Sequence, residues 1–251
     1  MAVDVDALAT ALRGFIVRHD LEFSRLTGRR SQLLELGALS IATKHYELHG
    51  YDVVPQNVRR GEFRVKLGTK GAPWNFSWFS AQRGGERVEI HGNLPVEDAL
   101  ATPGARYVVD VAVIRADSFP TARDRRREWT ALANPALVTF LEAKALVVYP
   151  MLLAQFVGIV HELKPQFLAG RRPWGFRSRN HFDPTLVSLG YLHGTCRNIV
   201  AGYRDRKCMI GVVPSFDEEI ASLRLGAAES PLDANHRRAP HPRGSDAAER
   251  T

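Results

Sequence analysis

The sequence predicts an α/β fold in which a central mixed β-sheet is flanked by helices and preceded by an extra N-terminal helix. Two kinds of pattern support this prediction. In roughly the first 26 residues, Leu8, Leu12 and Phe15 recur at helical spacing. Further along, the apolar runs 107–114 and 137–148 have the composition of buried strands.

The other elements follow in chain order. A second helix is expected from Ser31, a suitable N-cap, to about His49, where Gly50 ends it. A third helix begins at Pro150 and runs to about Phe167. Glycine-containing turns bound the shorter β-like segments. The remaining predicted elements are strands at 63–67, 75–82, 87–91, 185–192 and 208–213, and a final helix at 216–225.

Composition predicts a folded protein with a polar tail, and the length of the chain allows one large domain or two small ones. The chain has 251 residues, of which 45% are hydrophobic, enough for a sizeable core. We expect residues 1–225 to form a single domain, with residues 1–30 as a helical extension. From Gly226 onward large apolar residues almost disappear, so we expect residues 226–251 to be disordered or ordered only by a partner.

The net charge of +7 points to an anionic partner, with nucleic acid as the first candidate. The two cysteines, Cys196 and Cys208, cannot build a disulfide framework or a four-thiolate zinc site. The N-terminus lacks the pattern of a signal peptide, and no apolar run reaches the ~20 residues that span a bilayer. We therefore expect a cytoplasmic protein that does not bind membranes.

Two strand-like segments each carry a lone acid in apolar surroundings. Asp110 lies in the run 107–114, and Glu142-Ala143-Lys144 lies in the run 137–148. In a strand, Glu142 and Lys144 share one face. Buried carboxylates are costly unless a positive group neutralises them. The pattern therefore favours a site in which a divalent metal ion and Lys144 neutralise the two acids.

Two similar acid-x-Lys tripeptides occur elsewhere in the chain. Glu162-Leu163-Lys164 lies at the end of a helical stretch, and Asp205-Arg206-Lys207 lies in a polar turn. Both are expected to be solvated charges. The alternative for Glu142 and Lys144 is an exposed pair on an edge strand.

The chemistry of the first tripeptide suits phosphodiester hydrolysis. Asp110, Glu142 and the backbone carbonyl of Ala143 offer the hard oxygen ligands that Mg²⁺ prefers. A metal there would polarise the phosphate and activate a water. Lys144 would hold the attacking water or share the charge of the phosphate.

These segments resemble the PD-(D/E)xK nuclease superfamily, the restriction-endonuclease-like proteins. Residues 108–113 resemble the motif half that carries the acid, and residues 140–144 resemble the E-x-K half. The resemblance covers roughly residues 33–192, with Val109 where many members have proline. It implies a core of helix, three antiparallel strands, helix and strand, and a Mg²⁺-dependent nuclease in which Mn²⁺ can substitute.

The resemblance also implies a further acid from the first core helix. Glu35 is the candidate, because residues 50–54 resemble the family's passage from that helix into the sheet; Glu47 is the competing residue. Some branches carry a glutamine and, four residues later, a tyrosine on the helix after E-x-K. Gln155 matches the first position, but Ile159 occupies the second, so Gln155 is kept only as a neighbour of the site.

Two arginine-rich segments, residues 124–129 and residues 170–181, are candidates for binding the DNA backbone. In the first, Trp129 could stack on a base, or the segment could be a short solvated helix with Trp129 packed beneath it. His91 would reach the site if its strand adjoins the strand of Asp110. The candidate phosphate-binding residues are Arg125, Arg126, Arg127, Arg171, Arg172 and Arg177.

The predicted function is a metal-dependent endonuclease acting on DNA. By analogy with the family, it would be a restriction enzyme or an effector of anti-phage defence, with any activating ligand or partner left open. Cutting both strands of a duplex needs two sites, so a homodimer or higher oligomer is expected. The alternatives are a catalytically silent nucleic-acid-binding or scaffold protein on this fold, and an unrelated α/β protein.

Overall fold

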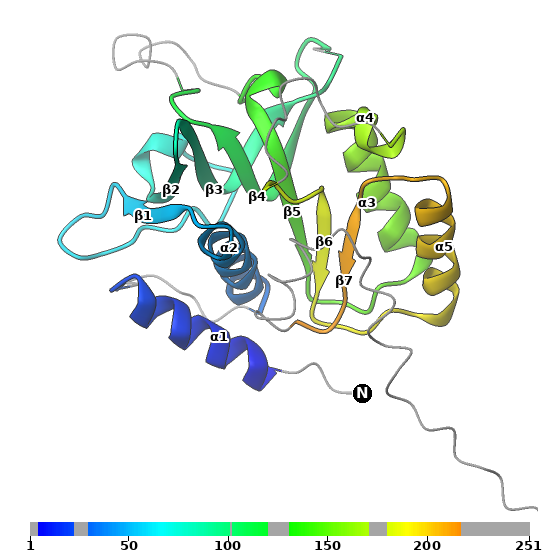
Figure 1. Ribbon diagram of the computed structural model, residues 1–251, viewed down its shortest axis with the longest axis horizontal. Helices are drawn as coiled ribbons and strands as arrows, with labels where there is room; N and C mark the ends of the chain where they lie inside the picture. Colours follow the sequence, from blue (N-terminus) through cyan, green and yellow to red (C-terminus); the bar gives the residue numbers. More distant parts are fainter. Residues whose placement is uncertain (1–4, 23–29, 101, 120–130, 171–179, 217–251) are drawn as a thin grey trace, which may run out of the picture.

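A computed structural model of the chain describes residues 5–22, 30–100, 102–119, 131–170 and 180–216. Its centre is a seven-stranded sheet in the order β1-β2-β3-β4-β5-β6-β7 (Figure 1). Neighbouring strands from β1 to β5 are antiparallel, whereas β6 and β7 run parallel to β5. The strands are β1 (Asp52–Gln56), β2 (Trp78–Arg83), β3 (Glu86–Glu97), β4 (Arg106–Arg115), β5 (Leu137–Lys144), β6 (Thr185–Ser188) and β7 (Gly211–Val213).

Helices cover both faces of this sheet, which confirms the predicted α/β class (Figure 1). One apolar cluster joins the sheet to α1 and α2, and a second joins it to α3, α4 and α5. Within the described residues, no helix is both long and apolar enough to cross a bilayer. The helices are α1 (Val5–Arg18), α2 (Arg30–Leu48), α3 (Pro150–Leu163), α4 (Pro165–Leu168) and α5 (Gly194–Asp205).

Helix α2 is buried along most of its length because it is covered by α1 and packs across β3, β4 and β5. Apart from the exposed Leu48 at its end, its leucines, alanines and isoleucine are buried or pack against the apolar core, as expected of a helix inside the core. At Gly37 a Cβ atom would lie 2.7 Å from the Leu8 side chain and 2.9 Å from the Phe216 ring, so a larger residue would have to displace them. Gly37 therefore allows α1 and Phe216 to pack closely against α2.

A polar network that is buried at Tyr46 and His181 and partly exposed at Glu86 ties the C-terminal half of α2 to the sheet. The Tyr46 hydroxyl lies 2.7 Å from Nδ1 of His181, and Nε2 of that histidine lies 2.8 Å from Oε1 of Glu86 at the start of β3. The Tyr51 hydroxyl donates to the other Glu86 oxygen at 2.5 Å. Satisfied buried networks of this kind rigidify a core, and this one fixes α2 relative to β3.

Strand β3 changes the layer that its side chains enter. Val88 and Ile90 belong to the cluster under α1 and α2, but Leu94 and Val96 belong to the cluster under α3 to α5. Positions of one parity normally share a face, so the strand must bend between them. The bend is at Asn93, whose φ of 47° is left-handed. On either side of Asn93, Gly92 pairs with Val111 of β4 and Leu94 pairs with Val109 of β4.

Several predicted boundaries are wrong. Helix α1 ends at Arg18 rather than near residue 26, because Asp20 adopts a left-handed φ of 48°. Residues 63–67 are not a strand: they lie over the α1/α2 face, where Phe63 stacks on Phe79 with ring centroids 4.8 Å apart. Strand β5 ends at Lys144 instead of residue 148.

Later elements also differ from the prediction. Strands β2, β6 and β7 are shorter than expected, whereas β3 is much longer because it continues through the Asn93 bend. The helix after Pro150 breaks at Lys164 into α3 and α4. Helix α5 was not predicted at all. Beyond Phe216, the predicted final helix and the tail at 226–251 lie outside the described residues.

Candidate functional site

The predicted acids meet where β4 and β5 separate. The ladder between these strands includes the pair Val111 and Leu141 and does not continue past it. Beyond that pair, the backbone N–H of Ala143 donates 2.8 Å to Oδ2 of Asp110. A side-chain carboxylate thus takes the place of a ladder acceptor, and the two strands part around it. We call Asp110, Glu142, Lys144 and Glu35 the fork site.

Lys144 bridges the two strand carboxylates. Its Nζ lies 3.0 Å from Oδ2 of Asp110 and 2.9 Å from Oε2 of Glu142. Burial on its own lowers the pKa of Lys144, but the charges and hydrogen bonds of Glu142 and Asp110 outweigh it and raise that pKa above its usual value. The side chain of Lys144 is 34% exposed and that of Glu142 only 3%, so the site meets solvent at the lysine.

Glu142 is not fully satisfied by this bridge. Its Oε1 is buried and has no hydrogen-bond partner among the described residues. Burial, and then repulsion from Asp110, raise the pKa of Glu142 to about 7, although Lys144 and the backbone N–H of Asp110 act in the opposite direction. A buried carboxylate oxygen without a donor is costly, so this atom is suited to a ligand that brings positive charge.

Helix α2 brings Glu35, and not Glu47, to the fork site. The charges of Asp110 and Lys144 both act on Glu35, whose pKa is raised first by burial and further by Asp110. Its Oε2 accepts a 2.7 Å hydrogen bond from Nδ2 of Asn93. Glu47 instead pairs with Arg18 and His19, each at 3.3 Å. The structure thus separates two residues that the sequence left as competitors.

The charges of the fork site fit a divalent cation. Two carboxylates share the Lys144 ammonium, the charges of Asp110 and Lys144 also act on Glu35, and one buried Glu142 oxygen lacks a donor among the described residues. The Ala143 peptide adjoins the same Asp110 carboxylate. In the part of the chain that the structure describes, no three His, Cys, Asp or Glu side chains lie close enough to hold a metal ion by themselves. Any ion would therefore also need water or backbone ligands, as Mg²⁺ commonly does.

Sequence reasoning missed two residues beside the site. Asn93 bonds Glu35 through its side chain, and Nζ of Lys66 donates 2.7 Å to the backbone carbonyl of Asn93. Asparagine is unfavourable inside a strand, so Gly92-Asn93 was a signal of irregular backbone that the prediction overlooked.

Other predicted residues are not brought to the site. Gln155 lies on the exposed side of α3, and no hydrogen bond joins it to a described acid. Of the look-alike tripeptides, Asp205 and Lys207 are exposed as expected, but Lys164 is buried and donates 3.1 Å to the carbonyl of Asn134. All six candidate DNA-binding arginines, with Trp129, lie outside the described residues.

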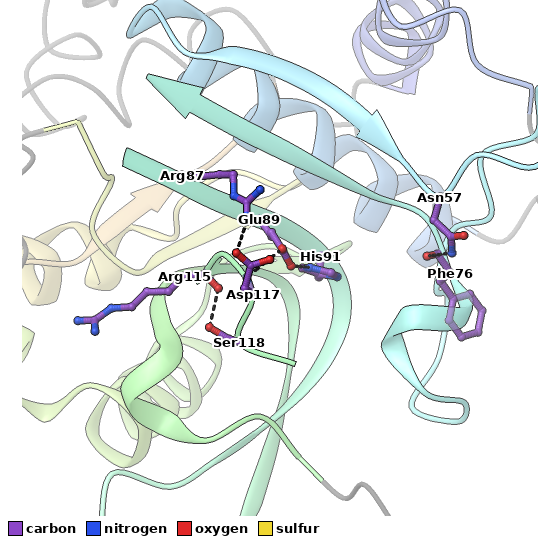
Figure 2. A network of polar contacts seen from close by, with 8 residues as sticks. All are labelled: Asn57, Phe76, Arg87, Glu89, His91, Arg115, Asp117 and Ser118. Atoms are coloured by element: carbon purple, nitrogen blue, oxygen red, sulfur yellow. Dashed lines mark hydrogen bonds and ion pairs between the residues drawn. The ribbon is translucent and has the colours of Figure 1, made fainter. Parts of the chain in front are cut away.

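His91 belongs to a separate cluster, although β3 does adjoin β4. Its Nε2 lies 3.0 Å from Oε2 of Glu89, and its ring stacks on Trp78 with centroids 5.5 Å apart. The Asp117 backbone N–H donates 3.2 Å to Oε1 of Glu89, and Arg87 pairs with the Asp117 side chain (Figure 2). We call Glu89 and His91 the β3 pair.

Comparisons with known proteins do not add to this picture. No family model matches the chain, and neither a curated protein nor a solved structure does. The function of the chain is therefore inferred from the fork site.

Proposed function

We propose that this protein is a metal-dependent endonuclease that hydrolyses phosphodiester bonds in DNA. The observation that carries the proposal is the meeting of Asp110, Glu142 and Lys144 where β4 and β5 separate, with one buried Glu142 oxygen left without a donor. A purely structural ion pair would be expected to satisfy both carboxylate oxygens in such a buried position.

The order of elements supports a restriction-endonuclease-like core as part of this proposal. Between α2 and α3 the chain forms five antiparallel strands, of which the last three are β3, β4 and β5. The parallel strand β6 follows α3 and the short helix α4. Asp110 lies on β4 and Glu142-Ala143-Lys144 on β5, the second and third of those last three strands, as the resemblance implies.

The residues have distinct roles in the proposed reaction. Asp110, Glu142 and the Ala143 carbonyl hold Mg²⁺ or Mn²⁺, and Glu35 adds a further carboxylate, directly or through water. When bound, the ion supplies Lewis acidity and positive charge at the scissile phosphate. Lys144, charged and partly exposed, orients the attacking water or stabilises charge that develops on the phosphate oxygens.

The substrate and assembly rest on less direct support. The net charge of +7 favours a polyanionic substrate such as DNA. A homodimer would place two fork sites on the two strands of a duplex. A role in restriction or anti-phage defence follows by analogy with the resembled family alone.

Nicking of supercoiled plasmid tests the proposal. The wild-type chain should nick DNA with Mg²⁺ or Mn²⁺ and not with EDTA. Lys144→Ala and Asp110→Ala should each reduce the rate by about 10²–10³-fold, the usual cost of losing one group that stabilises charge in the transition state. Lys207→Ala is the matched control, because Lys207 ends an exposed look-alike tripeptide, and it should nick at the wild-type rate.

Two outcomes would contradict the proposal in different ways. Wild-type protein that binds DNA but never nicks it under any divalent cation would rule out the enzyme. Full activity in Lys144→Ala, with circular dichroism showing a folded chain, would leave an enzyme but remove the fork site as its centre.

One observation favours a second candidate, a catalytically silent DNA-binding or scaffold protein on the same fold. Lys144 already contacts both strand carboxylates, so it supplies much of the neutralisation that a metal would provide. In that case Mn²⁺ would bind no more tightly to the wild-type chain than to Asp110→Ala, and DNA binding would be independent of divalent cations.

A further inference from the structure

Asn93 occupies a costly backbone position next to the fork site. Its φ of 47° lies in the left-handed region, although it is in the interior of the long strand β3. The neighbouring pairs, Gly92 with Val111 and Leu94 with Val109, place Asn93 opposite Asp110. Strained positions of this kind persist where the surrounding structure holds them, and they concentrate at functional sites.

The side chain of Asn93 connects two elements at that position. Its amide nitrogen, Nδ2, donates 2.7 Å to Oε2 of Glu35 on α2 and 3.0 Å to the backbone carbonyl of Lys66. An asparagine amide has two N–H donors, and both are used here. Since Asn93 is only 7% exposed, water does not compete readily for these bonds.

Lys66 completes the arrangement from the other side. Its ammonium donates 2.7 Å to the carbonyl of Asn93, and it also donates to the carbonyl of Gly68. Lys66 is 3% exposed, and burial lowers the pKa of its ammonium to about 8. Holding a buried ammonium against neutral carbonyls is costly. Lys66 and Asn93 thus bond each other reciprocally, each side chain donating to the other residue's backbone carbonyl. These bonds hold the backbone of the bend and the direction of the Asn93 amide.

We propose that Asn93, held by Lys66, is a positioning residue that fixes the Glu35 carboxylate for binding the divalent cation of the fork site. The inference rests on the proposed function and deepens it. Asn93 holds the Glu35 carboxylate through Oε2, and the charges of Asp110 and Lys144 act on that same carboxylate. The bend that separates the two layers of the core thereby also aligns the acid from α2.

Mn²⁺ binding to the full-length chain without DNA, followed by calorimetry, tests the inference. Asn93→Gly keeps the left-handed backbone accessible while removing the amide. It should weaken Mn²⁺ binding by about 10–100-fold, as the loss of a supporting hydrogen bond to a metal ligand commonly does. Glu35→Gln should weaken binding at least as much, and the double variant should be no weaker than Glu35→Gln alone.

Asn57→Gly is the matched control. Asn57 also has a left-handed φ, 54°, and its amide donates 3.1 Å to the carbonyl of Trp74. The same amide donates 2.8 Å to the carbonyl of Phe76 (Figure 2). It contacts none of the fork-site acids. Asn57→Gly should lower the unfolding temperature but leave Mn²⁺ affinity unchanged, so a purely structural effect can be recognised.

Kinetics and a second variant separate the outcomes. In Asn93→Gly, the Mg²⁺ concentration for half-maximal nicking should rise more than the rate at saturating Mg²⁺ falls. Should Asn93→Gly fail to fold, Lys66→Met, which removes the ammonium that holds the Asn93 carbonyl and adds no carboxylate, should also weaken Mn²⁺ binding. Wild-type Mn²⁺ affinity in a folded variant would overturn this inference alone. A wild-type chain that neither binds Mn²⁺ nor nicks DNA would overturn the proposed function along with it.

Discussion

The fork site and the β3 pair each contain a glutamate buried in a strand, Glu142 and Glu89, yet they leave these two carboxylates in opposite states. In the β3 pair, Glu89 uses both oxygens: one bonds His91 and the other accepts the Asp117 backbone N–H. Although burial raises the pKa of Glu89, these bonds outweigh it and bring the pKa below its usual value. In the fork site, one Glu142 oxygen has no donor and the pKa is raised to about 7.

The difference shows how a structural carboxylate can be told from one that is available for chemistry. A closed arrangement satisfies every acceptor from within the chain, and it needs no ligand. An open arrangement leaves an acceptor unfilled, and in the fork site burial and then repulsion from Asp110 raise the pKa of Glu142, as commonly happens in active sites. In the β3 pair, His91 and the backbone N–H of Asp117 satisfy both oxygens of Glu89. In the fork site, Lys144 satisfies only one oxygen of Glu142.

The largest expected difference between the two regions is in cleavage. Glu142→Gln should reduce the nicking rate by about 10²–10³-fold, because it removes charge from the metal-binding group. The isosteric change Glu89→Gln should leave the rate within twofold of wild type, while lowering the free energy of unfolding by about 1–3 kcal/mol through its disrupted buried bonds. Plasmid nicking and urea unfolding measure the two effects. Equal losses of activity in both variants would erase the functional contrast.

The pH dependence of stability should have opposite signs in the two regions. Between its usual value of 4.5 and about 7, Glu142 holds a proton in the folded chain that the unfolded chain has released. Its contribution to the free energy of unfolding therefore falls as pH rises, on the order of 1 kcal/mol per pH unit in this window. Glu89, whose pKa is lowered, contributes stability above its usual value of 4.5 and loses it as pH falls through its folded pKa.

Urea unfolding at pH 5, 6 and 7 measures the first of these slopes. Glu142→Gln should remove the Glu142 component, and Mg²⁺ should reduce it because the ion competes with the proton for the carboxylate. A slope that is unchanged by both treatments would show that Glu142 is not the group responsible.

The smallest expected effect sharpens the contrast within α2. Glu47→Gln should leave nicking and Mn²⁺ affinity unchanged and cost less than about 1 kcal/mol, as its ion pair with Arg18 is partly exposed. Glu35→Gln on the same helix should weaken Mn²⁺ binding. If the two variants behaved in reverse, the assignment of the helix acid would pass to Glu47.

Local patterns were sufficient for much of the fold. Continuous apolar runs located β4 and β5, and the boundary residues Ser31, Gly50 and Pro150 located α2 and α3. Among the glycine-containing turns, Gly84-Gly85 correctly marked the hairpin between β2 and β3. Helix α5 also carried a signal, since Cys196, Val200 and Tyr203 recur at helical spacing, but its polar residues and glycines obscured it. Residues 63–67 read as a strand because their composition suits β-structure, whereas pairing depends on an available edge.

By itself, the sequence determined that two acids and a lysine lie in adjacent apolar segments, because strand periodicity and local composition are short-range properties. Only the tertiary structure decided that Glu35 rather than Glu47 reaches them, since that choice depends on how α2 crosses the sheet. The same holds for Asn93 and Lys66, whose roles arise from a bend in β3 and from contacts between residues distant in the chain. Residues that only packing brings together leave no local pattern in the sequence. For this reason the sequence indicated the two strand acids and Lys144 but gave no sign that Asn93 and Lys66 support the site.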